Sequence, residues 1–113
     1  MATKQIQKDL LELYEKQAVV TRALAHPLRI AILNLLRQAP CCVQEIAGQV
    51  GGKQSNISRH LGILVSAGIL DYEKKGLRVV YTLKTRCVLR FLDCLSDHLK
   101  EQIETDQKLL EII

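Results

Sequence analysis

The chain has 113 residues, four cysteines and a formal net charge of +4 at pH 7, and its pI is about 9.0. This length suits a single domain. No apolar run reaches the roughly 18 residues that a membrane helix needs, and the N-terminal residues are too polar for a signal sequence. We therefore expect a cytoplasmic protein with no membrane partner, in which the cysteines are thiols or metal ligands rather than disulfides.

The N-terminal third predicts two helices separated by a break. Apolar residues recur at helical spacing through residues 4–24, which indicates one long amphipathic helix. The pair His26-Pro27 interrupts it, with His26 as a boundary or capping residue and Pro27 in the first turn of a second helix. The buried face of this second helix is predicted to consist of Leu28, Ala31, Ile32 and Leu35.

The stretch from residue 42 to residue 81 predicts a helix, a turn, a second helix and a two-stranded hairpin. Gly51 and Gly52 end the first helix, and Ser55 is placed to cap the second. Charged residues around Gly76 form the tip of the hairpin. A helix-turn-helix followed by a β-hairpin is a winged helix, which reads DNA. The apolar positions of the two helices are Val43, Ile46, Ala47, Val50, Ile57, Leu61 and Leu64.

Three segments, ALAHPLRIAILNLL, QSNISRHLGILVSAGIL and KKGLRVVYTL, together resemble the ArsR/SmtB family of winged helix-turn-helix repressors. The resemblance implies an α+β, mostly α fold of five helices with a two-stranded β-hairpin wing. It implies a homodimer joined through its first and last helices, which binds double-stranded operator DNA and leaves it when an inducer binds. Residues 1–113 then form one domain: dimerisation helix 1–25, reading head and wing 27–84, and C-terminal dimerisation helix 85–113.

The polar residues that start the second helix of the motif are the predicted DNA contacts, because this end enters the major groove in helix-turn-helix proteins. Asn and Gln can pair with adenine and Arg with guanine, while Ser and Lys can contact phosphate. The basic hairpin is expected to meet phosphate as well. The predicted contacts are Lys53, Gln54, Ser55, Asn56, Ser58, Arg59 and His60 on and before the helix, and Lys74, Lys75 and Arg78 at the wing.

The last helix, from Thr85 as its cap to about Leu110, has two faces. Val88, Leu92, Leu95, Leu99 and Ile103 should pack on the chain's own body or on its partner. A second line holds Cys87, Cys94, His98 and Glu101. Cys87 and His98 lie about 16 Å apart along one helix, so they could share an ion only across two antiparallel helices. Compared with the family's zinc-type sites, Thr85 and Cys87 are departures, and Cys87 favours softer ions.

The adjacent cysteines Cys41 and Cys42 precede the first helix of the motif, where a thiol is expected to become more acidic. Cys42 and Glu45 have the spacing of a capping box. The segment resembles the family's arsenic- and cadmium-type sensors, except that Gln44 stands at the second cysteine position. A third sulfur would have to come from Cys87 or Cys94; the alternative is that the cysteines are simply small buried residues.

The leading hypothesis is a repressor whose inducer is a thiophilic metal or metalloid ion, As(III), Cd(II) or Zn(II), bound at Cys41, Cys42, Cys87, Cys94, His98 and Glu101 or a subset of them. A thiol-based redox or reactive-sulfur sensor of the same fold is the alternative. We expect no enzyme activity and no organic cofactor, because the sequence has neither a C-x-x-C motif nor an evident nucleophile, histidine and acid set.

Overall fold

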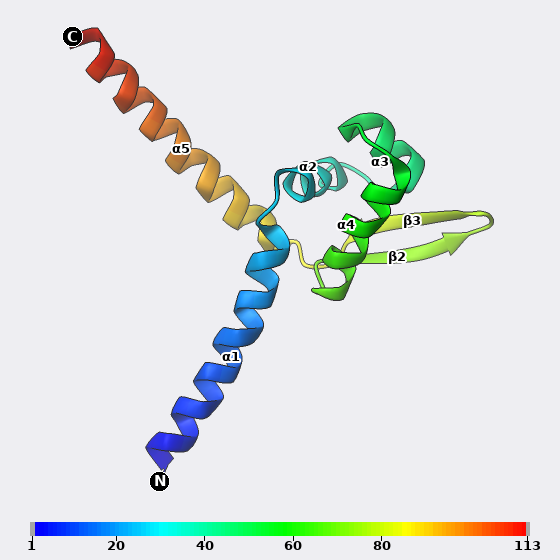
Figure 1. The fold of residues 1–113 in the computed structure, drawn as a ribbon, viewed down its shortest axis with the longest axis horizontal. Helices are drawn as coiled ribbons and strands as arrows, with labels where there is room; N and C mark the ends of the chain where they lie inside the picture. The colour runs from blue at the N-terminus through cyan, green and yellow to red at the C-terminus, as the bar shows by residue number, and fades with distance from the viewer. Residues whose placement is uncertain (1, 113) are drawn as a thin grey trace.

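In the computed structural model, which describes residues 2–112, two long helices extend from a head of short helices and a small sheet (Figure 1). The predicted succession of helices and wing strands is confirmed. The helices are α1 (Ala2–Leu24), α2 (Pro27–Leu36), α3 (Val43–Val50), α4 (Gln54–Ser66) and α5 (Cys87–Ile112), and the strands are β1 (Cys41–Cys42), β2 (Leu70–Lys75) and β3 (Arg78–Leu83).

The sheet contains one strand more than the sequence predicted. Strands β2 and β3 form the expected antiparallel hairpin, with Leu70 opposite Leu83 and Lys75 opposite Arg78. The two-residue strand β1 pairs antiparallel with the other edge of β3, so the strand order is β1-β3-β2. A strand of two residues is too short to show the alternation of apolar and polar residues by which strands are predicted from sequence. The wing is therefore joined by backbone hydrogen bonds to the segment just before α3.

The hydrophobic core lies inside the head, between α2, α3, α4 and the sheet. Ile46 of α3 and Ile57, Leu61 and Leu64 of α4 are fully buried, as their spacing predicted. The predicted buried face of α2 is partly wrong, because α2 contacts α3, α4 and β3 and so buries a different side. Ala31 is exposed and Leu35 is half-buried, whereas the fully or nearly fully buried residues of α2 are Ile32, Leu33 and Leu36.

The junction of α1 and α2 has the predicted break. His26 is the N-cap of α2, and its Nδ1 accepts a hydrogen bond of 3.1 Å from the backbone N–H of Leu28. Within residues 2–112, no single helix has the length and hydropathy to cross a membrane; α1 and α2 meet that requirement only when counted together across their 87° bend.

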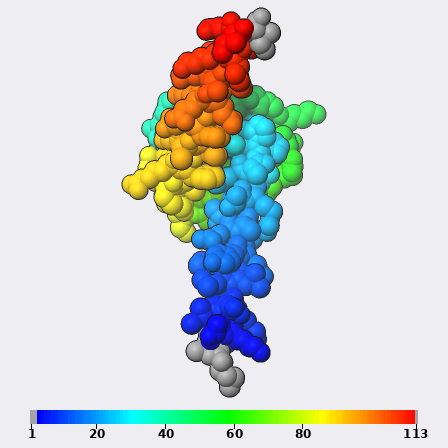
Figure 2. All heavy atoms as spheres, turned by 90° about the vertical axis from the view of Figure 1, so that its left-hand side faces the viewer, coloured from blue at the N-terminus to red at the C-terminus, as the bar shows by residue number. Residues whose placement is uncertain are grey.

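Both long helices extend beyond the head (Figure 2). They leave large apolar side chains exposed. The radius of gyration is 18.4 Å, whereas a compact domain of this length has a radius of about 13 Å. On α5, the predicted stripe divides: Val88 and Leu92 are buried against the head, but Leu95, Leu99 and Ile103 are 40–56% exposed. The exposed apolar residues of α1 are Ile6, Leu10, Leu11, Leu13, Tyr14 and Val19.

Candidate DNA interface and thiol sites

The N-terminal turn of α4 presents a polar surface. Lys53 occupies the N-cap position, and Gln54, Ser55, Asn56 and Ser58 are all exposed. The prediction that Ser55 caps this helix is wrong, because the N-cap is Lys53, two residues earlier, and its side chain makes no capping hydrogen bond. Ser55 lies inside the first turn, so its hydroxyl stays free for a ligand.

Arg59 and His60 follow on α4 but face different surroundings. Arg59 is exposed and donates to the Asn56 Oδ1 at 3.0 Å. His60, expected on the outer side, is only 2% exposed, so that expectation is wrong. It lies on the same helix face as Ile57 and Leu64, and its ring packs on the ring of His26 with centroids 4.5 Å apart. In this position, the His60 side chain cannot reach a ligand outside the protein.

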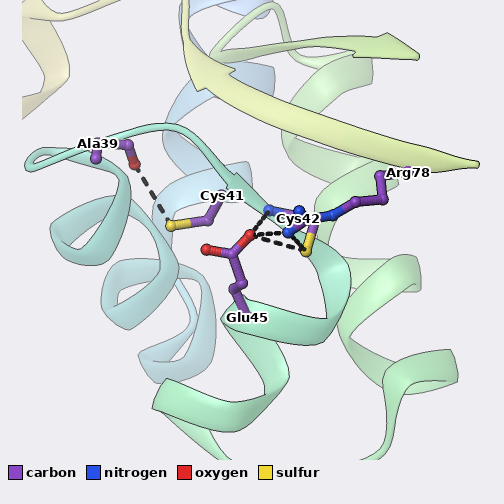
Figure 3. A network of polar contacts seen from close by, with 5 residues as sticks. All are labelled: Ala39, Cys41, Cys42, Glu45 and Arg78. Carbon is purple, nitrogen blue, oxygen red and sulfur yellow. Dashed lines mark hydrogen bonds and ion pairs between the residues drawn. The ribbon is translucent and has the colours of Figure 1, made fainter. Parts of the chain in front are cut away.

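The wing carries two free lysines and one arginine that turns back to the head. Lys74 and Lys75 are exposed at the end of β2. Arg78, at the start of β3, forms an ion pair with Glu45 of α3, and its Nη2 also donates to Cys42 Sγ at 3.0 Å (Figure 3). The sequence analysis predicted that Arg78, like the two lysines, contacts DNA phosphate. In the structure, its side chain instead links the wing to the N-terminal end of α3.

The adjacent thiols of Cys41 and Cys42 point to different sides (Figure 3). Successive side chains of an extended strand alternate between its faces, and both residues belong to β1. Cys42 is buried, and its thiol donates to the Glu45 Oε1 at 3.0 Å. Cys41 is partly exposed, and its thiol donates to the Ala39 carbonyl at 3.5 Å. The structure therefore brings Cys42, Glu45 and Arg78 together and leaves Cys41 aside.

Glu45 determines the electrostatics of this region. The predicted capping box forms, because the Cys42 backbone N–H donates to Glu45 Oε1 at 3.4 Å. Hydrogen bonds from the Cys42 side chain and backbone, together with the charge of Arg78, lower the pKa of Glu45. Burial and the charge of Glu45 raise the pKa of the Cys41 thiol. Desolvation and a nearby carboxylate therefore both disfavour the thiolate of Cys41.

The line of possible ligands on α5 is exposed throughout: Cys87, Cys94, His98 and Glu101 all face outward. All four cysteines of the chain are free thiols. Thr85 does not cap α5, which begins at Cys87; its hydroxyl instead donates to the Gly68 carbonyl at 2.8 Å. Across residues 2–112 of one chain, no three His, Cys, Asp or Glu side chains are grouped closely enough to hold a metal ion.

One basic surface beside α4 escaped the sequence analysis. Arg22 near the end of α1 and Arg29 at the start of α2 line the same groove as Arg59. The three arginines belong to three helices and share no motif, so no spacing in the sequence predicts that they meet.

Comparison with known proteins agrees with this fold. Residues 26–72, from the start of α2 to β2, match the model of the arsR family of bacterial regulatory proteins. The transcriptional repressor SmtB of Mycobacterium tuberculosis is 39% identical over 72 residues, which is 64% of this chain. These residues make up 53% of that repressor, so the chain spans about half its length. A transcriptional repressor SmtB homolog of Synechocystis is 29% identical over 100 residues, which cover 87% of this chain and 76% of the homolog.

A solved structure extends the match to most of the chain. The homodimeric winged helix-turn-helix DNA-binding domain Mb0332 of Mycobacterium bovis, a possible ArsR-family transcriptional regulator, superposes with a TM-score of 0.74 at 30% identity. The superposition covers 83% of this chain and 87% of that domain. With its family motif, its repressor relatives and its winged helix-turn-helix architecture, the chain belongs to the ArsR family of bacterial regulatory proteins.

Proposed function

We propose that this chain is a homodimeric transcriptional repressor that binds a roughly palindromic operator and is released by a thiophilic inducer. The observation that carries this proposal is the joint exposure of the polar N-terminal turn of α4 and the basic tip of the wing. Lys53, Gln54, Ser55, Asn56 and Ser58 offer donors and acceptors to base edges and phosphates. Lys74 and Lys75 add positive charge at the end of the hairpin.

The apolar surface of the two long helices supports the dimer. Leu99 and Ile103 of α5 and Ile6 of α1 are more than half exposed, although they lie on regular apolar stripes. An exposed apolar surface of this extent marks an interaction site. A two-fold axis that covers α1 and α5 would present two α4 helices to successive major grooves, with half-sites about 34 Å apart.

The finer part of the proposal concerns the inducer. An ion such as As(III), Cd(II) or Zn(II) prefers thiolate and imidazole ligands. Two groups of residues remain candidates. One is the pair of thiols before α3, of which Cys42 lies beside Glu45 and Cys41 points to the other side of β1. The other is the α5 line of Cys87, Cys94, His98 and Glu101. Since one chain does not group three ligands within residues 2–112, an α5 site requires side chains from the partner subunit, as an antiparallel pairing of two α5 helices provides.

Release from the operator depends on the thermodynamic coupling between inducer binding and DNA binding. The inducer must bind the form with low operator affinity more tightly than the DNA-competent form, because only this difference in affinity shifts the equilibrium. A site on α5 would act on the spacing of the two α4 helices through the dimer interface. A site at Cys42 would act through Glu45 and Arg78 on the wing.

The test is operator binding by fluorescence anisotropy, titrated with As(III), Cd(II), Zn(II) and a mild oxidant. The wild-type protein is compared with Cys42→Ser and Cys87→Ser variants, with the molar mass of each measured by light scattering. We expect a dimer that binds DNA from its own promoter region in dilute salt and is released by at least one reagent. A monomer, or a protein that ignores all such DNA, contradicts the repressor function; a complex that no reagent disturbs contradicts only the thiophilic inducer.

The exposure of Cys87 and Cys94 favours a second candidate, a repressor controlled by thiol oxidation or reactive sulfur. Mass spectrometry after treatment with mild oxidant or polysulfide separates the two. A Cys–Cys or polysulfide link that accompanies DNA release supports the redox sensor, whereas unmodified thiols that bind metal support the metal sensor.

A further inference from the structure

A groove of about 610 Å³ lies between the C-terminal end of α1, the start of α2 and the outer side of α4. Its apolar or small lining residues include Val19, Gly62 and Ile63. Its three charged residues, Arg22, Arg29 and Arg59, each come from a different helix, and none of the lining residues is acidic. Positive charge therefore converges on a partly apolar surface beside the helix that we propose to read DNA.

The three arginines have no acidic partner within residues 2–112, where both ion pairs involve other arginines, Arg37 with Asp93 and Arg78 with Glu45. Arg59 bonds only to the neutral groups of Asn56 and His60. The Nε of Arg29 is buried and has no hydrogen-bond partner. A buried donor of this kind is normally satisfied, and its desolvation is costly when it is not. The groove is thus lined by three guanidinium groups whose charge no carboxylate offsets, and one of these arginines has an unpaired Nε.

The buried histidine beside these arginines is affected by the same excess of positive charge. His60 is 2% exposed, and its Nδ1 has no hydrogen-bond partner. Burial lowers the pKa of His60, and the positive charges of Arg59 and Arg29 lower it further. Arg59 and Arg29 therefore act on one small region with no negative charge to offset them.

We propose that Arg22, Arg29 and Arg59 form a binding site for an anionic oxygen group, supplied either by a backbone phosphate of bound DNA or by a free oxyanion. The planar guanidinium group matches phosphate and carboxylate with paired hydrogen bonds. The space above Gly62 is open, since a Cβ built there meets no atom within 4 Å. An anion in the groove would neutralise the positive charge that the three guanidinium groups bring together.

The DNA source rests on the proposed repressor function and is tested first. An Arg22→Gln/Arg29→Gln double variant removes two groove charges, and an Arg86→Gln/Arg90→Gln double variant removes two exposed charges outside the groove. Operator affinity is measured by fluorescence anisotropy from 50 to 300 mM KCl, after circular dichroism has shown that both variants are folded. If the groove holds one phosphate, the slope of log affinity against log salt becomes shallower by about 0.9 in the groove variant only.

The free-anion source is tested on the protein without DNA. Inorganic phosphate is titrated in a sulfonate buffer at constant ionic strength, and the arginine Nε–Hε resonances are followed by NMR. Saturable shifts of Arg29 and Arg59, without a shift of Arg86, are expected. A Gly62→Met variant, which keeps every arginine but fills the groove, should lose these shifts.

The two measurements assign the source. A changed salt slope alone identifies a DNA phosphate, saturable phosphate shifts alone identify a free oxyanion, and both together identify a site that accepts either. An unchanged salt slope with no saturable shift overturns the proposal. If the wild-type protein binds no DNA, the repressor function fails, and the phosphate titration still decides whether the groove is an anion site.

Discussion

Arg78 on wing strand β3 forms an ion pair with Glu45 in the first turn of α3, 33 residues earlier in the chain. The same guanidinium donates to Cys42 Sγ at 3.0 Å, and the Cys42 thiol donates to Glu45. A buried thiol, a helix cap and a wing arginine thus share one carboxylate. A ligand or oxidant that changed the state of Cys42 would disturb the contact that turns Arg78 toward the head.

The first prediction concerns Glu45. A Glu45→Gln substitution should free the Arg78 side chain to reach a DNA phosphate, because the neutral amide holds a guanidinium more weakly than a carboxylate does. We expect tighter operator binding at low salt and a salt slope that is steeper by about 0.9, the value for one added phosphate contact. Glu73→Gln on the wing is the matched control, since it removes the same charge at an exposed position. Equal effects in both variants would mean that net charge alone, not the release of Arg78, tightens binding.

The second prediction concerns the tip of the wing. A Lys75→Ala substitution should weaken operator binding while leaving the preference for operator over random DNA nearly unchanged, because a phosphate contact carries no sequence information. The salt slope should become shallower by about 0.9. Anisotropy titrations at several salt concentrations measure both quantities, with Lys84→Ala at the base of the hairpin as the control. A salt slope equal to that of the wild type would rule out a phosphate contact at Lys75.

The third prediction is a pH dependence caused by His60. Its pKa is lowered in the folded protein, chiefly by burial, so the unfolded chain binds the proton more readily. Stability from the neutral ring is therefore present above the ordinary histidine pKa of about 6.5 and is lost as pH falls below it. A His60→Met variant should show a smaller fall in melting temperature between pH 7.5 and 5.5 than the wild type.

The control for this measurement is His98→Gln, which removes an exposed histidine of α5. The His98→Gln variant should keep the pH dependence of the wild type. If the melting temperature of the His60→Met variant falls as much between pH 7.5 and 5.5 as that of the wild type, His60 is not the group that couples folding to pH.

The fourth prediction concerns the exposed stripe of α5. Leu99, which is 53% exposed on a regular apolar face, should become buried in the dimer. A Leu99→Glu substitution should produce a monomer with lost operator binding and an intact head, because an unpaired carboxylate is costly to bury. Lys108→Gln changes the charge by the same amount two and a half turns away, on the opposite side of the helix, and should remain a dimer. Analytical ultracentrifugation distinguishes the two; a Leu99→Glu dimer would exclude this face from the interface.

Local patterns were enough to predict the order of the elements. The spacing of Ile46, Ile57, Leu61 and Leu64 identified the buried sides of α3 and α4, because a helix brings residues three and four apart onto one face. Pro27 marked the start of α2, since its ring is compatible only with a first turn. Each of these signals depends on residues within a few positions of one another.

The candidate sites depend on contacts between distant residues, and these only the tertiary structure decided. It buried His60 among the core residues, directed the thiols of Cys41 and Cys42 to different sides of β1, and turned Arg78 toward Glu45. It also placed Arg22, Arg29 and Arg59 around one groove. A sequence pattern records the direction of a side chain relative to its own helix or strand. Which other segment packs there is determined by how the whole core is filled, so the partners of these residues could not be predicted from their neighbours in the chain.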